Sequence, residues 1–540
     1  MASLVFLYSR APVYFSPGEF IRPFILLGLV LLLLYLLTGW ILRDHNWTGL
    51  LLVVLVLGFF SSMDFAYIYS LTVLSIFILV WAAYRFHFVA RPGMKHVYFV
   101  VQVVGLVAIT LALFSIYPAL NTIPDSYYGN TWNVVHSKRY LGLDPVSNAR
   151  PDIYYIVLDE YGRSDILSQI YGFDNSDFVN HLEQKGFIVP QNSRSNYART
   201  VLSVASTLNM DYIDDFAPQL EKSSLWWLMS PWLDHSLVRT SLQRIGYRSV
   251  SISTEWSITD NPTTDIYYKS HPVMLSDFER YVLSETPLYL SLPALQDWAS
   301  VPTYEAHRRV ELNNFDALIK SSSLPGPKFV FAHLLLPHPP FVFSDTGSPI
   351  DPEYPFTLKD ADAPGMFDSS EQYQAQYVDQ VQFLNSQLER VVDTILENSD
   401  RPPIIILQAD HGPRLLTDFS SPQNTCLAES FSTFSAYYLP GMEAGTIPDD
   451  ITSVNIFRIV FDRYFNADVP LLKNKEYYPR YGLGFYNFED ITNGVGTYAN
   501  CGVDSLAKNT GIQSKRTGSI SYTFSAIQTI YSVPRSARGH

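Results

Sequence analysis

Charge and cysteine are both scarce in this sequence of 540 residues. Asp, Glu, Lys and Arg make up 16% of the chain, whereas an average soluble protein has about 25%. This charge density excludes a largely disordered chain. Cys426 and Cys501 are the only cysteines, which excludes a disulfide-rich scaffold and a cysteine-ligated metal protein. Because 51 acidic residues outnumber 37 Lys and Arg, we expect no nucleic-acid partner.

Long apolar runs dominate the first 120 residues. Charged residues are absent from four stretches, at 23–42, 47–62, 65–84 and 97–120. Because a helix needs about 20 apolar residues to span a bilayer, we predict a transmembrane domain of about four helices over residues 1–120. The alternative is a helical bundle buried inside a soluble protein.

Positive side chains predict how these spans cross the membrane. The connection at 85–96 contains two arginines and a lysine, and Arg43 follows the first stretch. Lys and Arg mark cytoplasmic loops, so everything after residue 120 is expected outside the cytoplasmic membrane. The chain is then a multi-pass protein of the inner or cytoplasmic membrane, and the domain after residue 120 is extracytoplasmic. The same topology leaves Arg10 and Arg22 outside, with the N-terminus.

The predicted position of the domain outside the cytoplasmic membrane affects what the two cysteines can form. In an oxidising compartment Cys426 and Cys501 could form a disulfide. Two unpaired buried thiols are the alternative, and the sequence leaves this choice open.

Alternating strands and helices are predicted after residue 150. Short apolar runs that are typical of buried parallel strands occur at 153–158, 249–252, 329–335 and 404–407. Between the last two runs, apolar residues recur at helical spacing over 377–396, with a cap signal at Ser370 and Glu371. The predicted fold class is therefore α/β, with a central, mainly parallel sheet.

Changes in composition along the chain predict the domain boundaries. Residues 121–150 are rich in Tyr, Asn, Pro and Ser without periodicity, and we interpret them as a linker along the membrane surface. Residues 151–498 form the α/β domain. Residues 499–540, which mix Ser, Thr and Gly, are interpreted as a C-terminal tail.

Acids and histidines follow three of the apolar runs. Asp159 comes directly after the first run, His338 follows the third, and Asp410 and His411 follow the last. Ligands of open α/β sheets bind beyond the carboxyl ends of the strands, so we expect these side chains to converge. Two carboxylates and an imidazole suit one Zn²⁺ or Mn²⁺ ion and leave a position open for substrate.

Thr200 supplies a candidate nucleophile. The apolar residues after it predict a helix with Thr200 at its start, where free amide groups and the helix dipole favour an anion. Coordination to a metal would lower the pKa of the hydroxyl and activate it. A plain helix cap is the alternative interpretation.

Each signal has a simpler interpretation when it is taken alone. Asp-His-Gly at 410–412 is typical of a turn, and Pro-His-Pro-Pro at 337–340 is typical of a rigid loop. We expect Glu160 to be an exposed acid at the strand end, with coordination of the metal as its alternative. His333 is expected to be a satisfied core histidine, and His307 a residue of a helix surface.

Taken together and in this order, the motifs resemble the alkaline phosphatase superfamily. An apolar strand ending in Asp159, the Thr-x-x-Ser helix start at Thr200, the Pro-His-x-Pro segment around His338 and Asp-His-Gly at 410–412 carry the resemblance. Within the superfamily, the sequence resembles the membrane-anchored sulfatase-like transferases: phosphoethanolamine transferases, lipoteichoic acid synthases and phosphoglycerol transferases. Those proteins have several N-terminal spans before an extracytoplasmic catalytic domain. The resemblance implies a sulfatase-like fold for the α/β domain.

The resemblance also implies a role for each motif residue. Asp159, Asp410 and His411 would bind a divalent metal, Zn or Mn, together with Thr200 as the metal-bound nucleophile. His338 would contact the transferred phosphoryl or sulfuryl group.

The sequence departs from the family pattern at several points. Asp159 stands where the transferases usually have Glu. A further histidine ligand is expected after Asp-His-Gly in two-metal members, but His540 is the only later histidine, so we expect one metal. The sulfatase signature Cys-x-Pro-x-Arg is absent at Thr200.

Three functions follow from these motifs. The first is a transferase that moves a phospho-head group from a membrane lipid donor to a glycan, lipid or polymer acceptor of the cell envelope, through a phospho-threonine intermediate. The second is a membrane-anchored phosphodiesterase, phosphatase or sulfatase-like hydrolase, in which water is the acceptor. The third is an inactive scaffold of cell-envelope assembly, which the complete set of Asp159, Thr200, Asp410 and His411 disfavours.

Overall fold

The computed structural model describes residues 17–42, 139–146, 150–221, 223–254, 258–270, 276–284, 303–353, 369–419, 421–443, 445–479 and 485–495, and the single positions 123, 127, 130, 131, 133, 134, 256, 367 and 501. The predicted spans at 47–62, 65–84 and 97–120 lie outside the described residues, as does nearly all of the predicted tail.

Six strands form the central sheet of the described residues. They are β1 (Ile153–Leu158), β2 (Arg248–Ile252), β3 (Ile266–Tyr268), β4 (Lys328–Leu334), β5 (Ile404–Ala409) and β6 (Ser435–Tyr438). Their order is β3-β2-β4-β1-β5-β6, and all neighbours are parallel except β6, which is antiparallel to β5. Every residue of β1, β4 and β5 is buried, as expected for parallel strands covered on both faces. The predicted α/β fold with a mainly parallel sheet is confirmed.

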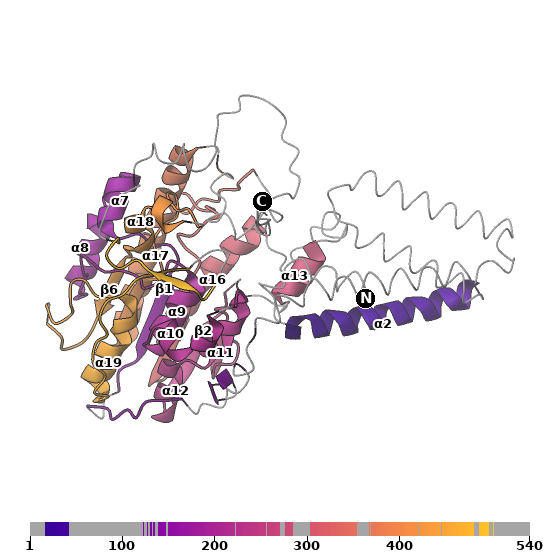
Figure 1. The fold of residues 1–540 in the computed structure, drawn as a ribbon, viewed down its shortest axis with the longest axis horizontal. Helices are drawn as coiled ribbons and strands as arrows, with labels where there is room; N and C mark the ends of the chain where they lie inside the picture. Colours follow the sequence, from indigo (N-terminus) through magenta and orange to yellow (C-terminus); the bar gives the residue numbers. More distant parts are fainter. Residues whose placement is uncertain are drawn as a thin grey trace, which may run out of the picture.

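Helices cover both faces of this sheet (Figure 1). Successive side chains of a strand point to opposite faces, so Tyr154 and Ile156 join one apolar cluster while Tyr155 and Val157 join the other. The first cluster includes helices α7 (Ser164–Tyr171), α8 (Ser176–Gln184), α16 (Tyr304–Ser322) and α17 (Ser370–Asn398). The second includes α9 (Thr200–Asn209), α11 (Ser230–Asp234), α12 (Leu237–Arg244) and α19 (Ile456–Phe465).

Smaller elements complete the described part of the domain. They are α10 (Ile213–Phe216), α18 (Leu427–Phe431), 3₁₀ turns at 218–220, 226–229, 422–424 and 453–455, and a separate pair of strands, β7 (Tyr477–Pro479) and β8 (Phe488–Asp490).

Helix α17 confirms the helix predicted over 377–396. It begins at Ser370 and is capped by Ser369, whose hydroxyl accepts a hydrogen bond from the amide of Gln372. The cap therefore lies one residue before the predicted Ser370.

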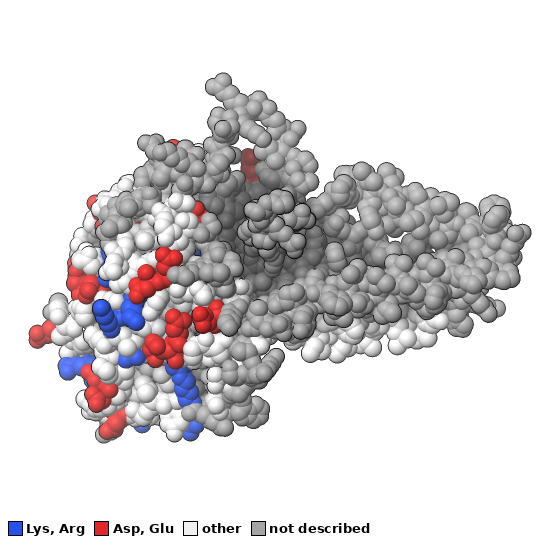
Figure 2. Space-filling view, in the orientation of Figure 1, with Lys and Arg blue, Asp and Glu red and all other residues white. Residues whose placement is uncertain are grey.

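Helix α2 (Pro17–Leu42) overlaps the first predicted span. Over Gly18–Trp40 it is long and apolar enough to cross a membrane, judged by length and composition. Figure 2 shows an uncharged surface along the visible side of α2, whereas the charged side chains of the described residues gather on the α/β domain.

The first turns of α2 contact α13 (Asp277–Ser284), a helix of the chain segment between β3 and α16 (Figure 1). Arg22 forms an ion pair with Glu279, and the rings of Phe20 and Phe278 are 6.0 Å apart. The start of α2 therefore packs against α13, and the number of spans stays a prediction.

Part of the predicted linker contributes to the core. Tyr127, Val134 and Leu143 are buried in the apolar cluster around α9 and α19. The amide of Asp144 donates to the carbonyl of Phe465 at 2.9 Å. Apolar side chains spaced too irregularly to reveal an element can still fill a core, and the domain boundaries themselves remain a prediction.

Cys426 and Cys501 form a disulfide. Of the two alternatives that the sequence left open, the structure has the bonded pair. Cys426 is also the N-cap residue of α18, so the bond fastens residue 501 to the start of that helix.

Replacing Cys501 with Ser should lower the stability of the domain by roughly 2–4 kcal/mol, because cross-linking residues far apart in sequence restricts the unfolded chain. Thermal unfolding of the full-length protein in detergent, without reductant, measures this effect. Wild-type protein treated with reductant should match the variant, and equal unfolding temperatures for untreated wild type and variant would contradict the prediction.

Candidate active site

The strand order brings the predicted acids together. β1 lies between β4 and β5, so the carboxyl ends of these three strands are adjacent. Asp159 directly follows β1, and Asp410 and His411 directly follow β5. His333 lies within β4, paired in register with Val157 of β1. All four side chains are buried.

The distances among these groups are short. His411 Nε2 lies 3.5 Å from Asp159 Oδ1 and 3.3 Å from Asp410 Oδ2. Thr200 Oγ1 lies 3.1 Å from the same nitrogen. The four residues predicted as metal ligands are therefore brought to one place.

His333 joins this group, although the sequence indicated only a core residue. Its Nε2 is 3.3 Å from Asp159 Oδ2, and suitable ligand atoms of Asp159, His333 and Asp410 all lie within 4.8 Å of one another. The expectation of a core position was right about burial, but the ring faces the carboxylates. A histidine inside an apolar strand gives no sequence signal for this orientation.

Both imidazoles are oriented by their Nδ1 atoms. His411 Nδ1 lies 3.0 Å from the carbonyl of Gly412, to which it donates. His333 Nδ1 lies 2.8 Å from Thr259 Oγ1, whose own hydroxyl has the carbonyl of Trp256 as an acceptor. An Nδ1 atom that donates in this way leaves the Nε2 atom of each ring facing the site, which is how histidine ligands of metals are commonly held.

Two carboxyl atoms in the centre suggest what this group of residues can hold. Within the part of the chain that the structure describes, Asp159 Oδ1 and Asp410 Oδ2 are buried without a hydrogen-bond donor. Buried oxygen atoms of this kind are costly unless a cation or a proton compensates them. Oxygen and imidazole ligands in this number suit a divalent metal such as Zn²⁺ or Mn²⁺, so the residues present fit the predicted ion.

Electrostatics point in the same direction. Burial raises the pKa of Asp410 to about 7, and the charge of Asp159 adds to the rise. Burial likewise opposes the charge of Asp159, but the nearby imidazoles, that of His338 first, outweigh it and hold the pKa of Asp159 below its usual range. For His333, burial lowers the pKa, but the neighbouring carboxylates raise it overall. The raised pKa values mean that protons on Asp410 and His333 offset the buried negative charge. A bound divalent cation would offset the same charge.

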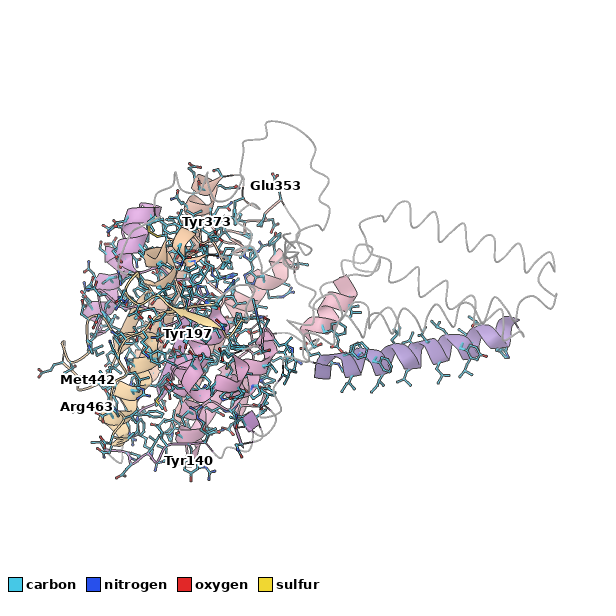
Figure 3. All side chains as sticks on the ribbon, in the orientation of Figure 1. Tyr140, Tyr197, Glu353, Tyr373, Met442 and Arg463 are labelled. Atoms are coloured by element: carbon cyan, nitrogen blue, oxygen red, sulfur yellow. A yellow bond between two sulfur atoms is a disulfide. The ribbon has the colours of Figure 1, made fainter. Side chains whose placement is uncertain are left out.

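Thr200 is the first residue of α9, and Arg199 precedes it in an extended conformation. The whole helix is buried, which fixes the hydroxyl in place. Tyr197, labelled near the middle of the domain in Figure 3, anchors the segment before the helix, since its hydroxyl accepts from the amide of Ile213 at 2.9 Å. The amides of Leu202 and Ser203 donate to the carbonyl of Arg199, which leaves those of Thr200 and Val201 at the open end of the helix.

Gly412 allows the Asp-His-Gly segment to pack closely. A Cβ atom at this position would overlap the carbonyl oxygen of Glu429 on α18. Only glycine fits there, so the motif that looked like a simple turn fixes the backbone beside His411.

Glu160 corrects one expectation from the sequence. It is fully buried rather than exposed, because the chain turns at Glu160 with a φ of 66° and carries the side chain inward. Its carboxylate lies 3.1 Å from Arg414 Nε and 3.8 Å from His338 Nε2. His338 therefore lies beside Glu160, at the edge of the site rather than among the inner ligands.

His307 also differs from the expectation from the sequence. It is buried on α16, not exposed on a helix surface, because α16 packs between β4 and α17. The charged residues around His307 suggested a solvated helix face, but Glu311 of the same helix is buried as well and accepts from the amide of Leu335 at 3.3 Å.

Two arginines that lie at the site were not identified from the sequence. Arg414 Nη2 lies 2.6 Å from His411 Nε2, where burial and the Arg414 charge lower the pKa of His411. Arg199 directly precedes Thr200. Their spacing from the motif residues was visible in the sequence, but nothing in it indicated that both side chains are buried.

Comparison with known proteins identifies the family. The family model described as sulfatase matches residues 151–460, more than half of the chain. The chain belongs to the sulfatase family. This confirms the resemblance to the sulfatase-like branch of the alkaline phosphatase superfamily. Membership of the sulfatase family does not by itself distinguish transfer from hydrolysis, and no curated protein matches the chain.

Several solved structures resemble this sulfatase-family chain at low identity. The C-terminal periplasmic domain of EcEptC from Escherichia coli matches at 11% identity with a TM-score of 0.43, covering 67% of this chain and 98% of its own. The integral membrane lipooligosaccharide phosphoethanolamine transferase A from Neisseria meningitidis matches at 12% identity with a TM-score of 0.38, covering 76% of this chain and 77% of its own. A 2-O GAG sulfatase, BT1596, matches at 13% identity with a TM-score of 0.38, covering 60% of this chain and 72% of its own. At these scores the likenesses carry no conclusion on function.

Divalent metal binding should weaken as the pH falls. A metal displaces protons from Asp410, whose pKa is about 7, so the affinity should drop by roughly ten-fold per pH unit from about pH 7 down to about pH 5 and level off above about pH 8. Calorimetric titration of the full-length protein with Zn²⁺ or Mn²⁺ measures this. An affinity that stays constant over the range contradicts the assignment of Asp410 to the metal site.

Proposed function

We propose that this sulfatase-family protein is a metal-dependent transferase that moves a phospho-head group from a membrane phospholipid to an acceptor of the cell envelope. The observation that carries the proposal is the position of Thr200. Its hydroxyl stands at the start of a buried helix, 3.1 Å from His411 Nε2. The same nitrogen lies 3.5 Å from a carboxylate oxygen of Asp159 and 3.3 Å from one of Asp410.

Asp159, Asp410, His411 and His333 would hold one divalent metal, with Thr200 as a further oxygen ligand. His333 is added to the set implied by the motifs because its Nε2 faces Asp159 and its Nδ1 is held by Thr259. When bound, the metal would lower the pKa of the Thr200 hydroxyl and neutralise negative charge on the phosphoryl oxygens.

The reaction then has two steps. In the first, a bond forms between Thr200 Oγ and phosphorus while the bond between phosphorus and the glycerol oxygen of the lipid breaks. The threonine proton is lost and the leaving oxygen gains a proton, so diacylglycerol departs neutral and a phospho-threonine diester remains. In the second step an acceptor hydroxyl attacks phosphorus and the Thr200 hydroxyl is restored.

Other residues of this chain assist both steps. The amides of Thr200 and Val201, at the start of α9, would donate toward the phosphoryl oxygens, where charge grows as the attacking oxygen arrives. His338 contacts the transferred group, since its Nδ1 donates to the carbonyl of Pro339 and its Nε2 faces the site edge beside Glu160.

Attachment to the membrane supports a lipid donor over a soluble ester. Helix α2 is long and apolar enough to cross a bilayer, and the ion pair of Arg22 with Glu279 holds its first turns against α13, a helix of the same chain that lies between β3 and α16 in sequence. A phospholipid head group would thus reach the site without leaving the membrane surface. Hydrolysis, with water as the acceptor, is the second candidate, favoured by membership of the sulfatase family.

Replacing Thr200 with Ala should abolish turnover and leave the fold intact, because it removes one hydroxyl at a helix start. Intact-mass spectrometry of the full-length protein, incubated with phosphatidylethanolamine or phosphatidylglycerol and Mn²⁺ or Zn²⁺, should show a head-group adduct on wild type only. Thr207→Ala is the matched control, since Thr207 lies on the same helix and its hydroxyl donates to the carbonyl of Ser203 at 2.9 Å.

The outcomes separate the candidate functions. An adduct on Thr200→Ala would place the nucleophile elsewhere. Release of the head group to water, at the same rate with and without acceptor, would favour the hydrolase.

Replacing Thr259 with Val should weaken metal binding by roughly 10–100-fold, because His333 loses the hydroxyl that orients it. His333→Gln should weaken it further. Thr394→Val, which removes a similar hydroxyl from the outer part of α17, should have no effect. Metal content after dialysis, measured by mass spectrometry of the metal, provides the test, and unchanged content in both site variants would exclude His333 as a ligand.

A further inference from the structure

The segment that carries His338 has few backbone donors of its own. Residues 337–342 have the sequence Pro-His-Pro-Pro-Phe-Val, and its three prolines have no N–H group. Of the amides that remain, that of His338 donates to the carbonyl of Asp159 at 3.1 Å. Phe341 and Val342 are fully buried. Buried backbone groups need hydrogen-bond partners, and this segment therefore depends on partners from elsewhere in the chain.

Gln380 of α17 provides such partners. Its Oε1 accepts from the amide of Val342 at 2.9 Å. Its Nε2 donates to the carbonyl of Pro337 at 3.2 Å and to that of His338 at 3.0 Å. The oxygen and the nitrogen of one side-chain amide thus both bond the backbone of residues 337–342. Gln380 is fully buried, so water does not compete for these bonds.

The same face of α17 also holds the chain that follows β1. Tyr377 lies three residues before Gln380, on the same side of the helix. The Tyr377 hydroxyl donates to the carbonyl of Glu160 at 2.7 Å and accepts from the amide of Gly162 at 3.1 Å. Helix α17 therefore bonds to both of the segments whose side chains, Glu160 and His338, face each other at 3.8 Å.

Packing fixes the helix that bears these two residues. Val381, Leu384 and Leu388 of α17 are fully buried in the apolar cluster on one face of the sheet. A helix packed at the density of a protein interior cannot shift without loss of contacts. Gln380 thus transmits the position of a rigid element to the backbone of His338.

We propose that Gln380 is a positioning residue for the transfer reaction, and that its hydrogen bonds to residues 337–342 place the His338 imidazole at the edge of the site. The inference rests on the proposed function, in which His338 contacts the transferred phosphoryl group. Gln380 acts through His338 and not on the phosphoryl group itself.

A double-mutant cycle with inorganic phosphate tests this route. Calorimetric titration of the full-length, Mn²⁺-loaded protein in detergent should show phosphate binding about ten-fold more weakly to His338→Ala, which loses a donor to a charged group. Gln380→Met, similar in length but without the amide, should weaken binding by about three- to ten-fold.

In the His338→Ala background, Gln380→Met should weaken phosphate binding by less than about two-fold further, because the imidazole through which it acts is gone. Effects that simply add would show that Gln380 acts independently of His338 and would overturn the proposal. An unchanged phosphate affinity in Gln380→Met alone would overturn it as well.

Gln374→Met is the matched control. It makes the same substitution on the same helix, but Gln374 donates to the carbonyl of Ile170 at 2.6 Å, away from residues 337–342. Phosphate affinity should stay at the wild-type value in this variant. Metal content after dialysis should be normal in Gln374→Met and Gln380→Met alike, and loss of metal in Gln380→Met alone would overturn a role that is confined to His338.

A milder variant serves if Gln380→Met does not fold. Gln380→Glu keeps an oxygen for the amide of Val342 but offers at most one proton where the amide offers two. It should weaken phosphate binding in the same direction, and wild-type affinity in this variant would contradict the proposal.

Hydrogen exchange measures the position of the segment without any ligand. Because of the prolines, residues 337–342 contain exchangeable amides only at His338, Phe341 and Val342. A peptide that covers this segment should exchange faster in Gln380→Met than in wild type and Gln374→Met. Equal exchange in all three proteins would overturn the proposal.

Turnover separates the inference from the proposed function. Transfer or release of the head group should slow in Gln380→Met but not in Gln374→Met. Wild-type turnover in Gln380→Met would overturn the inference alone. Absence of any adduct or release in wild type, with the phosphate cycle as expected, would refute the proposed reaction alone. Failure of wild type to bind phosphate would overturn the inference whether or not an adduct forms.

Discussion

Two carboxylates, Asp159 and Asp410, lie side by side in the interior of the domain, and their mutual repulsion governs the chemistry of the site. In a buried position neither charge is screened by water, so each needs a compensating positive charge. Protons meet this need in part, as the raised pKa of Asp410 indicates. The imidazole of His333, within β4, and that of His411, directly after β5, complete a set of atoms in which a divalent cation would be more effective than protons.

The sheet topology brings together both the two carboxylates and the imidazoles that lie beside them. Parallel strands β4, β1 and β5 end at the same edge, so residues separated by about 250 positions in sequence become neighbours. Helix α9 then aims its amino end at the same point, and a buried, apolar helix cannot shift to relieve crowding. Thr200, the proposed nucleophile, is thus positioned by packing that has no part in the chemistry.

Much of this could be predicted from the sequence, and the limits have physical causes. Asp159, Thr200, Asp410 and His411 stand at ends of strands or helices, where periodicity stops and a polar residue is conspicuous. His333 was misjudged because a ring inside an apolar strand looks the same whether it faces the core or a carboxylate. Glu160 was taken for an exposed acid because the backbone turn that buries it, with its positive φ, leaves no mark in the sequence. Arg199 and Arg414 escaped notice for a related reason, since burial of an arginine depends on tertiary neighbours such as Phe419.

Helix α2 bears on how this chain would meet a lipid. If α2 spans the bilayer, the domain that follows it stays tethered to the membrane, and the ion pair of Arg22 with Glu279 and the packing of Phe20 on Phe278 hold the start of α2 against α13. The enzyme would then meet the proposed lipid donor by diffusion in two dimensions. Its rate would follow the number of donor molecules per unit of membrane area, so dilution of the surrounding medium would leave the first step unchanged, whereas dilution of the donor with other lipids would slow it.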